Sequence, residues 1–126
     1  MSKDFPITIF HNPACGTSRD ALALIRAAGY EPTVVEYLKV GWTRPQLEDL
    51  LVAMSARPYD ILRQKGSPAA ELGLLDPSVG DAAIIDAMVA HPILVNRPIV
   101  ATPRGTKLAR PAEAVLDLLD RRPGAR

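Results

Sequence analysis

The sequence contains a single cysteine, Cys15, in 126 residues, and its formal net charge is only +1. One cysteine cannot form an internal disulfide, so the fold does not depend on oxidation and suits a reducing compartment. The small net charge gives no basis for nonspecific binding to nucleic acid or to a membrane surface. No apolar run is long enough for a transmembrane helix, and the N-terminal run is too short and too broken by Pro6 for a signal peptide. These absences predict a cytoplasmic protein.

What is present is typical of a globular chain. Hydrophobic residues make up 48% of the sequence and charged residues 23%, and 126 residues can bury a core without disulfides. The length predicts a single domain spanning residues 1–126. Its pattern is α/β: a βαβ unit, a helical insertion at about 43–90 and a ββα unit. The breaker-rich tail, residues 121–126, is expected to be flexible.

Short β-rich runs predict four strands, at residues 6–10, 32–37, 99–102 and 106–109. The last two flank a hairpin turn at 103–105. Between them the chain has helical patterns that begin at good N-terminal residues. The expected helices start after Cys15, at the capping box of Thr43 and Gln46, at Pro58, at Ser67-Pro68, at Asp81 and at Pro111.

Two of these expectations specify more than the start of a helix. Residues 39–42 are expected to be a loop that precedes the Thr43 capping box. The helix capped by Asp81 is expected to turn its apolar residues inward and to end at His91-Pro92. Its expected inward residues are Ile84, Ile85, Met88 and Val89.

The stretch His11-Asn12-Pro13-Ala14-Cys15-Gly16-Thr17-Ser18-Arg19 joins the first expected strand to the first expected helix. Cys15 should therefore lie just ahead of a helix N-terminus, where free N–H groups stabilise a thiolate and can cradle an oxyanion. The alternative is a small, buried and inert cysteine. We favour the nucleophile, because the residues after Cys15 are polar or permissive and do not have the composition of a core.

For two residues near Cys15 in the sequence, two roles are possible. The Ser18 hydroxyl can donate a hydrogen bond to the thiolate, or it can cap the helix. His11 is either an ordinary loop histidine or a group that orients the thiolate or stabilises it by charge. For His91, at an expected helix end, a capping role suffices. Two histidines and one cysteine, widely spaced in sequence, do not predict a metal site.

The stretch around Cys15 resembles the signature of the small thioredoxin-fold arsenate reductases of the ArsC family, which draw electrons from glutathione and glutaredoxin. His91-Pro92-Ile93-Leu94-Val95-Asn96-Arg97-Pro98-Ile99-Val100 and Gly105-Thr106-Lys107-Leu108-Ala109-Arg110-Pro111 match the same family. The resemblance covers about residues 7–119, and three separated motifs in the same order make it specific. It implies a thioredoxin-like mixed sheet.

The resemblance also implies roles for particular residues. Three arginines at the matching motif positions, Arg63, Arg97 and Arg110, would bind the substrate oxyanion, and forked guanidinium groups suit that task better than lysine. The His11 position in the pattern favours a role beside the thiolate. Pro98 would follow a cis peptide bond and face the cysteine.

The function implied is arsenate reduction: the Cys15 thiolate attacks arsenate, and glutathione and glutaredoxin resolve the adduct without a bound cofactor. The absence of a second cysteine agrees, because the resolving thiol must then come from outside. Phosphatase-like arsenate reductases need an arginine six positions after the cysteine, where this chain has Ala21. The alternatives are a thioredoxin-fold regulator that binds RNA polymerase, usually with Cys-x-x-Cys, and a thiol-transfer relative with another substrate.

Overall fold

The computed structural model describes residues 5–121, and the chain divides into two compact units. The first unit combines both ends of the chain, up to Tyr37 and again from Arg97. The second unit consists of Leu38–Asn96 and contains the expected helical insertion, with slightly wider bounds. Most of the expected flexible tail, residues 122–126, lies outside the described residues.

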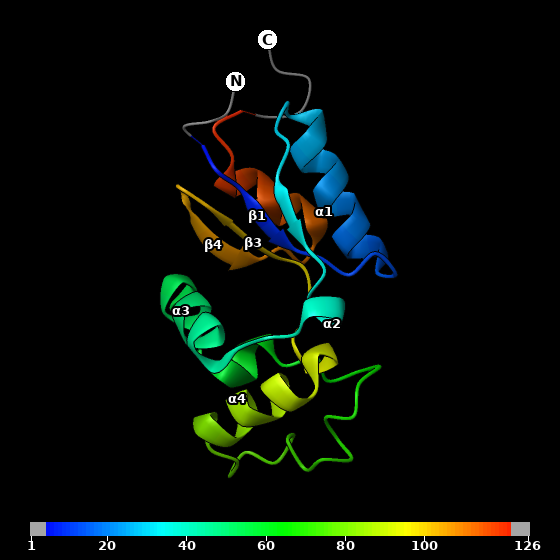
Figure 1. Ribbon diagram of the computed structural model, residues 1–126, viewed down its shortest axis with the longest axis vertical. Helices are drawn as coiled ribbons and strands as arrows, with labels where there is room; N and C mark the ends of the chain where they lie inside the picture. Colours follow the sequence, from blue (N-terminus) through cyan, green and yellow to red (C-terminus); the bar gives the residue numbers. More distant parts are fainter. Residues whose placement is uncertain (1–4, 122–126) are drawn as a thin grey trace. The chain divides into compact units, whose positions relative to one another are not determined.

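The first unit is built on a four-stranded sheet in the order β2-β1-β3-β4 (Figure 1). β1 runs parallel to β2, and β3 runs antiparallel to both β1 and β4. The α-helix α1, Gly16–Ala27, is the crossover between the parallel pair. The strands are β1 Thr8–Phe10, β2 Thr33–Val35, β3 Ile99–Thr102 and β4 Gly105–Leu108. This mixed sheet with its βαβ and ββα units confirms the expected thioredoxin-like α/β class.

One face of the sheet buries the core of the first unit. Ile9 and Val100 have no exposed surface, and they belong to one cluster with Ile25 of α1 and Val115 of η3. The element η3, Ala112–Leu118, is a 3-10 helix that packs against α1. Burial of these apolar side chains is the main stabilising contribution, and it fixes the α1 N-terminus at the carboxyl end of β1.

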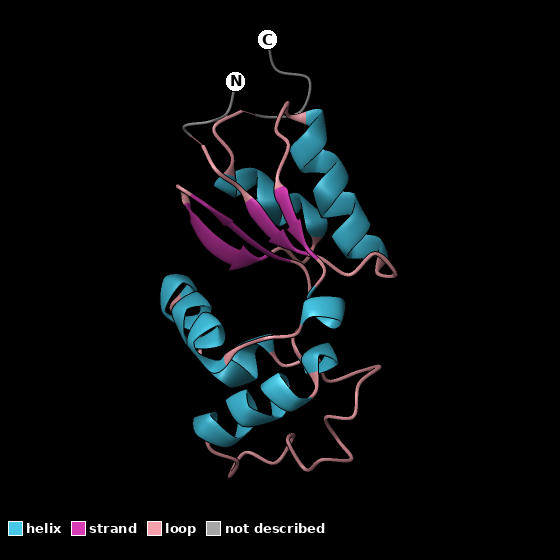
Figure 2. Ribbon diagram, in the orientation of Figure 1, coloured by secondary structure: helices cyan, strands magenta, loops and turns pink. Residues whose placement is uncertain are grey.

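The second unit is helical (Figure 2). Its longer helices are α3, Arg44–Met54, and α4, Asp81–Ala90, which contact each other. The short elements are α2 Tyr37–Val40, which begins at the boundary residue, and the 3-10 helices η1 Pro58–Ile61 and η2 Pro92–Leu94. His91 is the C-cap of α4, as expected.

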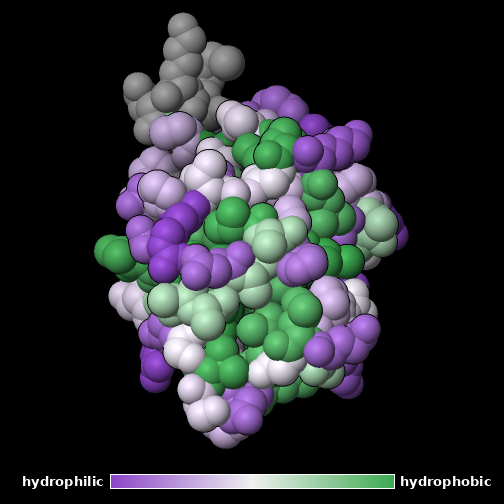
Figure 3. All heavy atoms as spheres, turned by 60° about the horizontal axis from the view of Figure 1, so that its bottom comes forward, coloured by the Kyte–Doolittle hydropathy of each residue, from purple (hydrophilic) through white to green (hydrophobic). Residues whose placement is uncertain are grey.

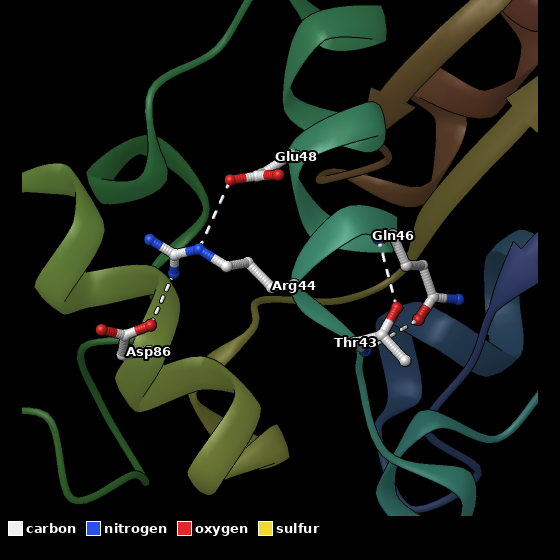
Figure 4. Close-up of polar contacts among 5 residues, drawn as sticks. All are labelled: Thr43, Arg44, Gln46, Glu48 and Asp86. Carbon is white, nitrogen blue, oxygen red and sulfur yellow. Dashed lines mark hydrogen bonds and ion pairs between the residues drawn. The ribbon is translucent and has the colours of Figure 1, made fainter.

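The start of α3 follows the sequence pattern closely. The Gln46 N–H donates to Thr43 Oγ1 at 3.3 Å, and the Thr43 N–H donates to Gln46 Oε1 at 3.4 Å, which completes the expected capping box (Figure 4). Arg44 then forms ion pairs with Glu48, at 3.5 Å, and with Asp86 of α4, at 2.5 Å. These charges are exposed, so the pairs orient the two helices more than they stabilise them.

Several sequence expectations are wrong in the second unit. Part of the expected loop at 39–42 is helical, because α2 extends to Val40. Ser67-Pro68 begins turns instead of a helix: the Ser67 hydroxyl accepts from the Ala69 N–H at 3.2 Å and closes a local turn. The N-cap of α4 is Gly80, so Asp81 is its first residue, and Val89 is 38% exposed.

Differences in the first unit are smaller. The expected first strand is shortened to β1, and the second ends at Val35 because Tyr37 already belongs to α2. The hairpin turn consists of 103–104, since Gly105 pairs with Thr102 as the first residue of β4. The final helix is of the 3-10 type.

The surface carries apolar side chains among polar ones, as Figure 3 shows for one face. The most exposed large apolar residues are Val40, 72% exposed, and Val52, 79% exposed. No helix within residues 5–121 combines the length and the apolar character needed to cross a membrane.

Candidate active site

The loop between β1 and α1 contains a tight turn that ends at Cys15. The Cys15 N–H donates to the Asn12 carbonyl oxygen at 3.0 Å, and Pro13 and Ala14 lie between the two residues. Asparagine followed by proline is a favourable start for such a turn. The Asn12 side chain closes it further, because its Oδ1 accepts from the Ala14 N–H at 3.0 Å. The turn leaves Cys15 in an extended conformation as the N-cap of α1.

His11 and Ser18 are joined by a buried hydrogen bond of 2.6 Å between His11 Nδ1 and Ser18 Oγ. Ser18 Oγ also accepts from the Asn12 N–H at 3.1 Å. Ser18 lies inside α1 and its side chain does not cap the helix, because Cys15 is the N-cap. The Ser18 hydroxyl therefore holds the loop against the first turn of the helix, and Arg19 adds a contact from Nη1 to the Pro13 carbonyl oxygen at 2.9 Å.

Two arginines from the other end of the chain reach the same sulfur. Arg110 Nη1 lies 3.9 Å from Cys15 Sγ and 2.9 Å from the Arg97 carbonyl oxygen, to which it donates a hydrogen bond. The Arg97–Pro98 peptide bond is cis, the geometry that the resemblance implies, and Pro98 is buried at the start of β3. The fold thus brings together Cys15, Arg97 and Arg110, which are far apart in sequence.

These surroundings make the sulfur acidic. Burial is the largest single influence and raises the pKa of the Cys15 thiol. The Ser18 backbone N–H, the positive charge of Arg97, and hydrogen bonds from Arg110 and Arg97 act in the opposite direction, and together they bring the pKa below its ordinary value.

His11 is held in its neutral form. Burial lowers the pKa of His11, Glu36 raises it, and Arg26 and Arg19 lower it, so the pKa stays below its ordinary value. An imidazole that is neutral at pH 7 cannot stabilise a thiolate by charge. The geometry therefore favours the orienting role over the electrostatic one, through the hydrogen bond to Ser18.

Arg63, the third arginine of the expected set, belongs to the second unit. Its backbone N–H donates to the Leu94 carbonyl oxygen at 2.7 Å, and its Nε donates to the Lys65 carbonyl oxygen at 2.9 Å. The guanidinium group lies against Gly66, whose φ of +71° is in the left-handed region.

Sequence reasoning missed Asn12 as a part of the site. Asn12 is only 6% exposed, and both its backbone and its side chain shape the turn that leads to Cys15. The Asn-Pro pair was the available signal, since asparagine before proline often forms a side-chain turn. A second cis bond, Arg110–Pro111, was also not expected.

Within the part of the chain that the structure describes, no group of three or more histidine, cysteine, aspartate and glutamate side chains is arranged to hold a metal ion.

The sequence and the fold match known proteins over most of their length. The chain is 62% identical to arsenate reductase ArsI2 of Synechocystis sp. over 117 residues, which are 93% of this chain and 84% of that protein. It is 58% identical to an arsenate reductase of Rhizobium meliloti, over 90% of this chain and 81% of the relative. The solved structure of an arsenate reductase from Vibrio cholerae superposes with a TM-score of 0.86 at 34% identity, covering 91% of this chain and 98% of that one.

The family assignment does not depend on these relatives alone. The profile of the ArsC family matches residues 10–118, a range that includes the Cys15 turn, the helical insertion and both arginines beside the sulfur. The chain belongs to the ArsC family.

Proposed function

We propose that this protein reduces arsenate to arsenite, with the Cys15 thiolate as the nucleophile. The observation that carries the proposal is the position of the Cys15 sulfur at the N-terminus of α1, 3.9 Å from the Arg110 guanidinium group. Low thiol pKa and a nearby forked donor are what attack on a small oxyanion requires. The names of the Synechocystis and Rhizobium relatives support arsenate as the substrate.

The proposed chemistry uses thiols alone. The Cys15 thiolate attacks arsenic(V), an S–As bond forms, and one arsenate oxygen leaves as water after it takes up protons. The glutathione thiol then reacts with this adduct. Arsenic(V) accepts two electrons and leaves as arsenite. The Cys15 and glutathione sulfur atoms supply these electrons and are left joined as a mixed disulfide. Glutaredoxin with further glutathione reduces that disulfide and returns the Cys15 thiol.

Each site residue has a proposed role in this sequence of steps. Arg97 and Arg110 bind the arsenate oxygens and keep Cys15 ionised, and we propose Arg63 as a third oxyanion ligand on the strength of its motif position. His11 and Ser18 hold the loop and the helix in register, which keeps the sulfur directed at the substrate. A disulfide that glutathione must reduce implies a reducing compartment, so we propose the cytoplasm.

The proposal is tested by turnover of the purified full-length protein with arsenate, glutathione and glutaredoxin, measured as arsenite released. We expect turnover with the complete mixture and its loss when either glutathione or arsenate is omitted. Replacing glutaredoxin and glutathione by thioredoxin and its reductase should not support comparable rates. Several turnovers without any external thiol, or none with the complete mixture, would contradict the proposal.

A further inference from the structure

Asn12 takes part in three hydrogen bonds within the Cys15 loop. Its carbonyl oxygen accepts from the Cys15 N–H at 3.0 Å, its Oδ1 accepts from the Ala14 N–H at 3.0 Å, and its N–H donates to Ser18 Oγ at 3.1 Å. The residue is 6% exposed. It therefore connects the turn, the sulfur-bearing residue and the first turn of α1.

We propose that Asn12 is a positioning residue for Cys15: its carboxamide oxygen fixes the turn that presents the sulfur at the N-terminus of α1 beside Arg110. The oxygen acts through the backbone, because it binds the N–H of Ala14, the residue directly before Cys15. Without this acceptor, Ala14 can rotate its N–H away, and Cys15 is then free to leave the extended N-cap conformation. The sulfur would lose its alignment with the Ser18 N–H and with Arg110.

The assignment of the oxygen atom follows from the donor. A backbone N–H needs an acceptor, so the atom of the carboxamide that faces Ala14 must be Oδ1 and not Nδ2. The positioning role of Asn12 thus depends on a short side chain with a neutral acceptor. Ser67 has such a side chain and forms a turn of the same kind. In Ser67-Pro68-Ala69, the Ser67 hydroxyl accepts from the Ala69 N–H at 3.2 Å, at the spacing of Asn12-Pro13-Ala14. We therefore expect serine at position 12 to preserve the turn, because it still offers an acceptor to the Ala14 N–H, and alanine to lose the turn.

The experiment compares Asn12→Ala, Asn12→Ser and Asn12→Asp with the wild type in the full-length protein. Thiol pKa is read from the pH dependence of Cys15 alkylation, which needs no arsenate. Turnover with arsenate, glutathione and glutaredoxin gives kcat and KM. Asp76→Ala is the matched control, because it removes a similar side-chain turn, from the Ser78 N–H to Asp76 Oδ1 at 2.8 Å, in the second unit.

We expect Asn12→Ala to raise the thiol pKa by about 0.5–1 unit, the size expected for one neutral hydrogen bond. It should lower kcat by about tenfold to a hundredfold, the cost of a misplaced reacting group, with little change in KM because both arginines remain. Asn12→Ser should recover most of both losses. Asp76→Ala should match the wild type in both measurements.

Asn12→Asp keeps the acceptor and adds a negative charge near the sulfur, so it should fold and raise the thiol pKa. If Asn12→Ala does not fold, Asn12→Ser decides the matter, because it keeps the acceptor without a charge and should retain a thiol pKa and a kcat close to those of the wild type. A wild-type thiol pKa and kcat in folded Asn12→Ala would overturn the inference, and so would a folded Asn12→Ser with the full defect expected of Asn12→Ala. The expected changes in kcat rest on the proposed function, whereas the expected changes in thiol pKa, measured by alkylation, do not. Absent arsenate turnover with an altered thiol pKa would therefore refute the proposed function alone.

Discussion

Arg110 and Cys15 lie 95 positions apart in sequence, and Arg110 Nη1 is 3.9 Å from the Cys15 sulfur. The same nitrogen donates to the Arg97 carbonyl oxygen at 2.9 Å, so the residues that flank the β3–β4 hairpin fix the position of the guanidinium group. The Arg110 side chain, which carries the charge beside the thiolate, is thus anchored to the backbone at Arg97 and does not move freely. A guanidinium group fixed in this way loses little entropy when it binds an oxyanion.

Arg110 should control both the thiol and the substrate. Arg110→Ala should raise the thiol pKa, because it removes a charged donor from the sulfur, and it should weaken arsenate binding. Arg110→Lys should change the thiol pKa less than it weakens arsenate binding, since lysine keeps the positive charge but cannot donate two parallel hydrogen bonds. Alkylation of Cys15 against pH and KM for arsenate measure the two effects. We expect Arg97→Ala to act similarly, and unchanged pKa and KM in both alanine variants would show that the oxyanion pocket lies elsewhere.

Cys15→Ser should abolish arsenate reduction and leave the fold intact. A serine hydroxyl is a far poorer nucleophile at neutral pH, and the chain has no other cysteine to replace the thiolate. The circular dichroism spectrum and the unfolding midpoint should remain close to those of the wild type, because oxygen fits the space of sulfur at the N-cap. Arsenite release above the background of the reagents would exclude Cys15 as the nucleophile.

His11 should make the folded protein sensitive to acid. Its folded pKa is lowered, chiefly by burial, so below about pH 6.5 the unfolded chain binds a proton that the folded chain resists. The free energy of unfolding should therefore fall as the pH drops below this value, and His11→Gln should show a weaker fall. Glu36→Gln should lower the His11 pKa further, because Glu36 favours the imidazolium form.

Proton NMR of the imidazole signals gives the His11 pKa directly. The chain has only one other histidine, His91, so the spectrum of His11→Gln assigns the two signals. A His11 signal that titrates above pH 7 would contradict both the neutral imidazole and the orienting role that we derive from it.

Thr43→Ala should destabilise the second unit by about 1 kcal/mol, the usual cost of losing an N-cap. Thr43→Ser keeps the capping oxygen and should cost only a few tenths of this, which makes it the matched control. Trp42 fluorescence reports unfolding of the second unit, and the reactivity of Cys15 reports the first, since the chain has one of each residue. A single cooperative domain predicts that Thr43→Ala shifts both transitions equally, and a shift in fluorescence alone would mean independent units.

The sequence was most informative where local chemistry decides the structure. Thr43 and Gln46 predicted the capping box because its two hydrogen bonds lie within four residues. The Cys15 stretch likewise predicted its own place between a strand and a helix. In contrast, Ser67-Pro68 has equally good helix-starting residues but forms turns, because the Ser67 oxygen binds the nearby Ala69 N–H. The same residue types serve both structures, so sequence alone could not separate them.

The candidate site was predictable only in part for a related reason. The motifs identified Arg97 and Arg110, but their approach to Cys15 depends on pairing between strands at opposite ends of the chain. Asn12 was not recognised because its hydrogen bonds stay within the loop, and the Asn-Pro pair predicts a turn without indicating which residue the turn presents. The Val89 side chain was expected to be buried from its helical spacing, yet it is exposed, because α4 is apolar on more than the face that it buries.

The division of the first unit between the two ends of the chain has a consequence for the protein during its synthesis. β1 and α1 leave the ribosome first, but their antiparallel neighbour β3 begins at Ile99, so a nascent chain cannot complete the sheet until β3 and β4 have been translated. Until then Cys15 lacks the positive charge of Arg97 and the hydrogen bonds of Arg97 and Arg110, which lower its pKa in the folded protein. The full lowering of the thiol pKa therefore needs both parts of the first unit, and we expect nascent chains that lack β3 and β4 to carry a less acidic cysteine.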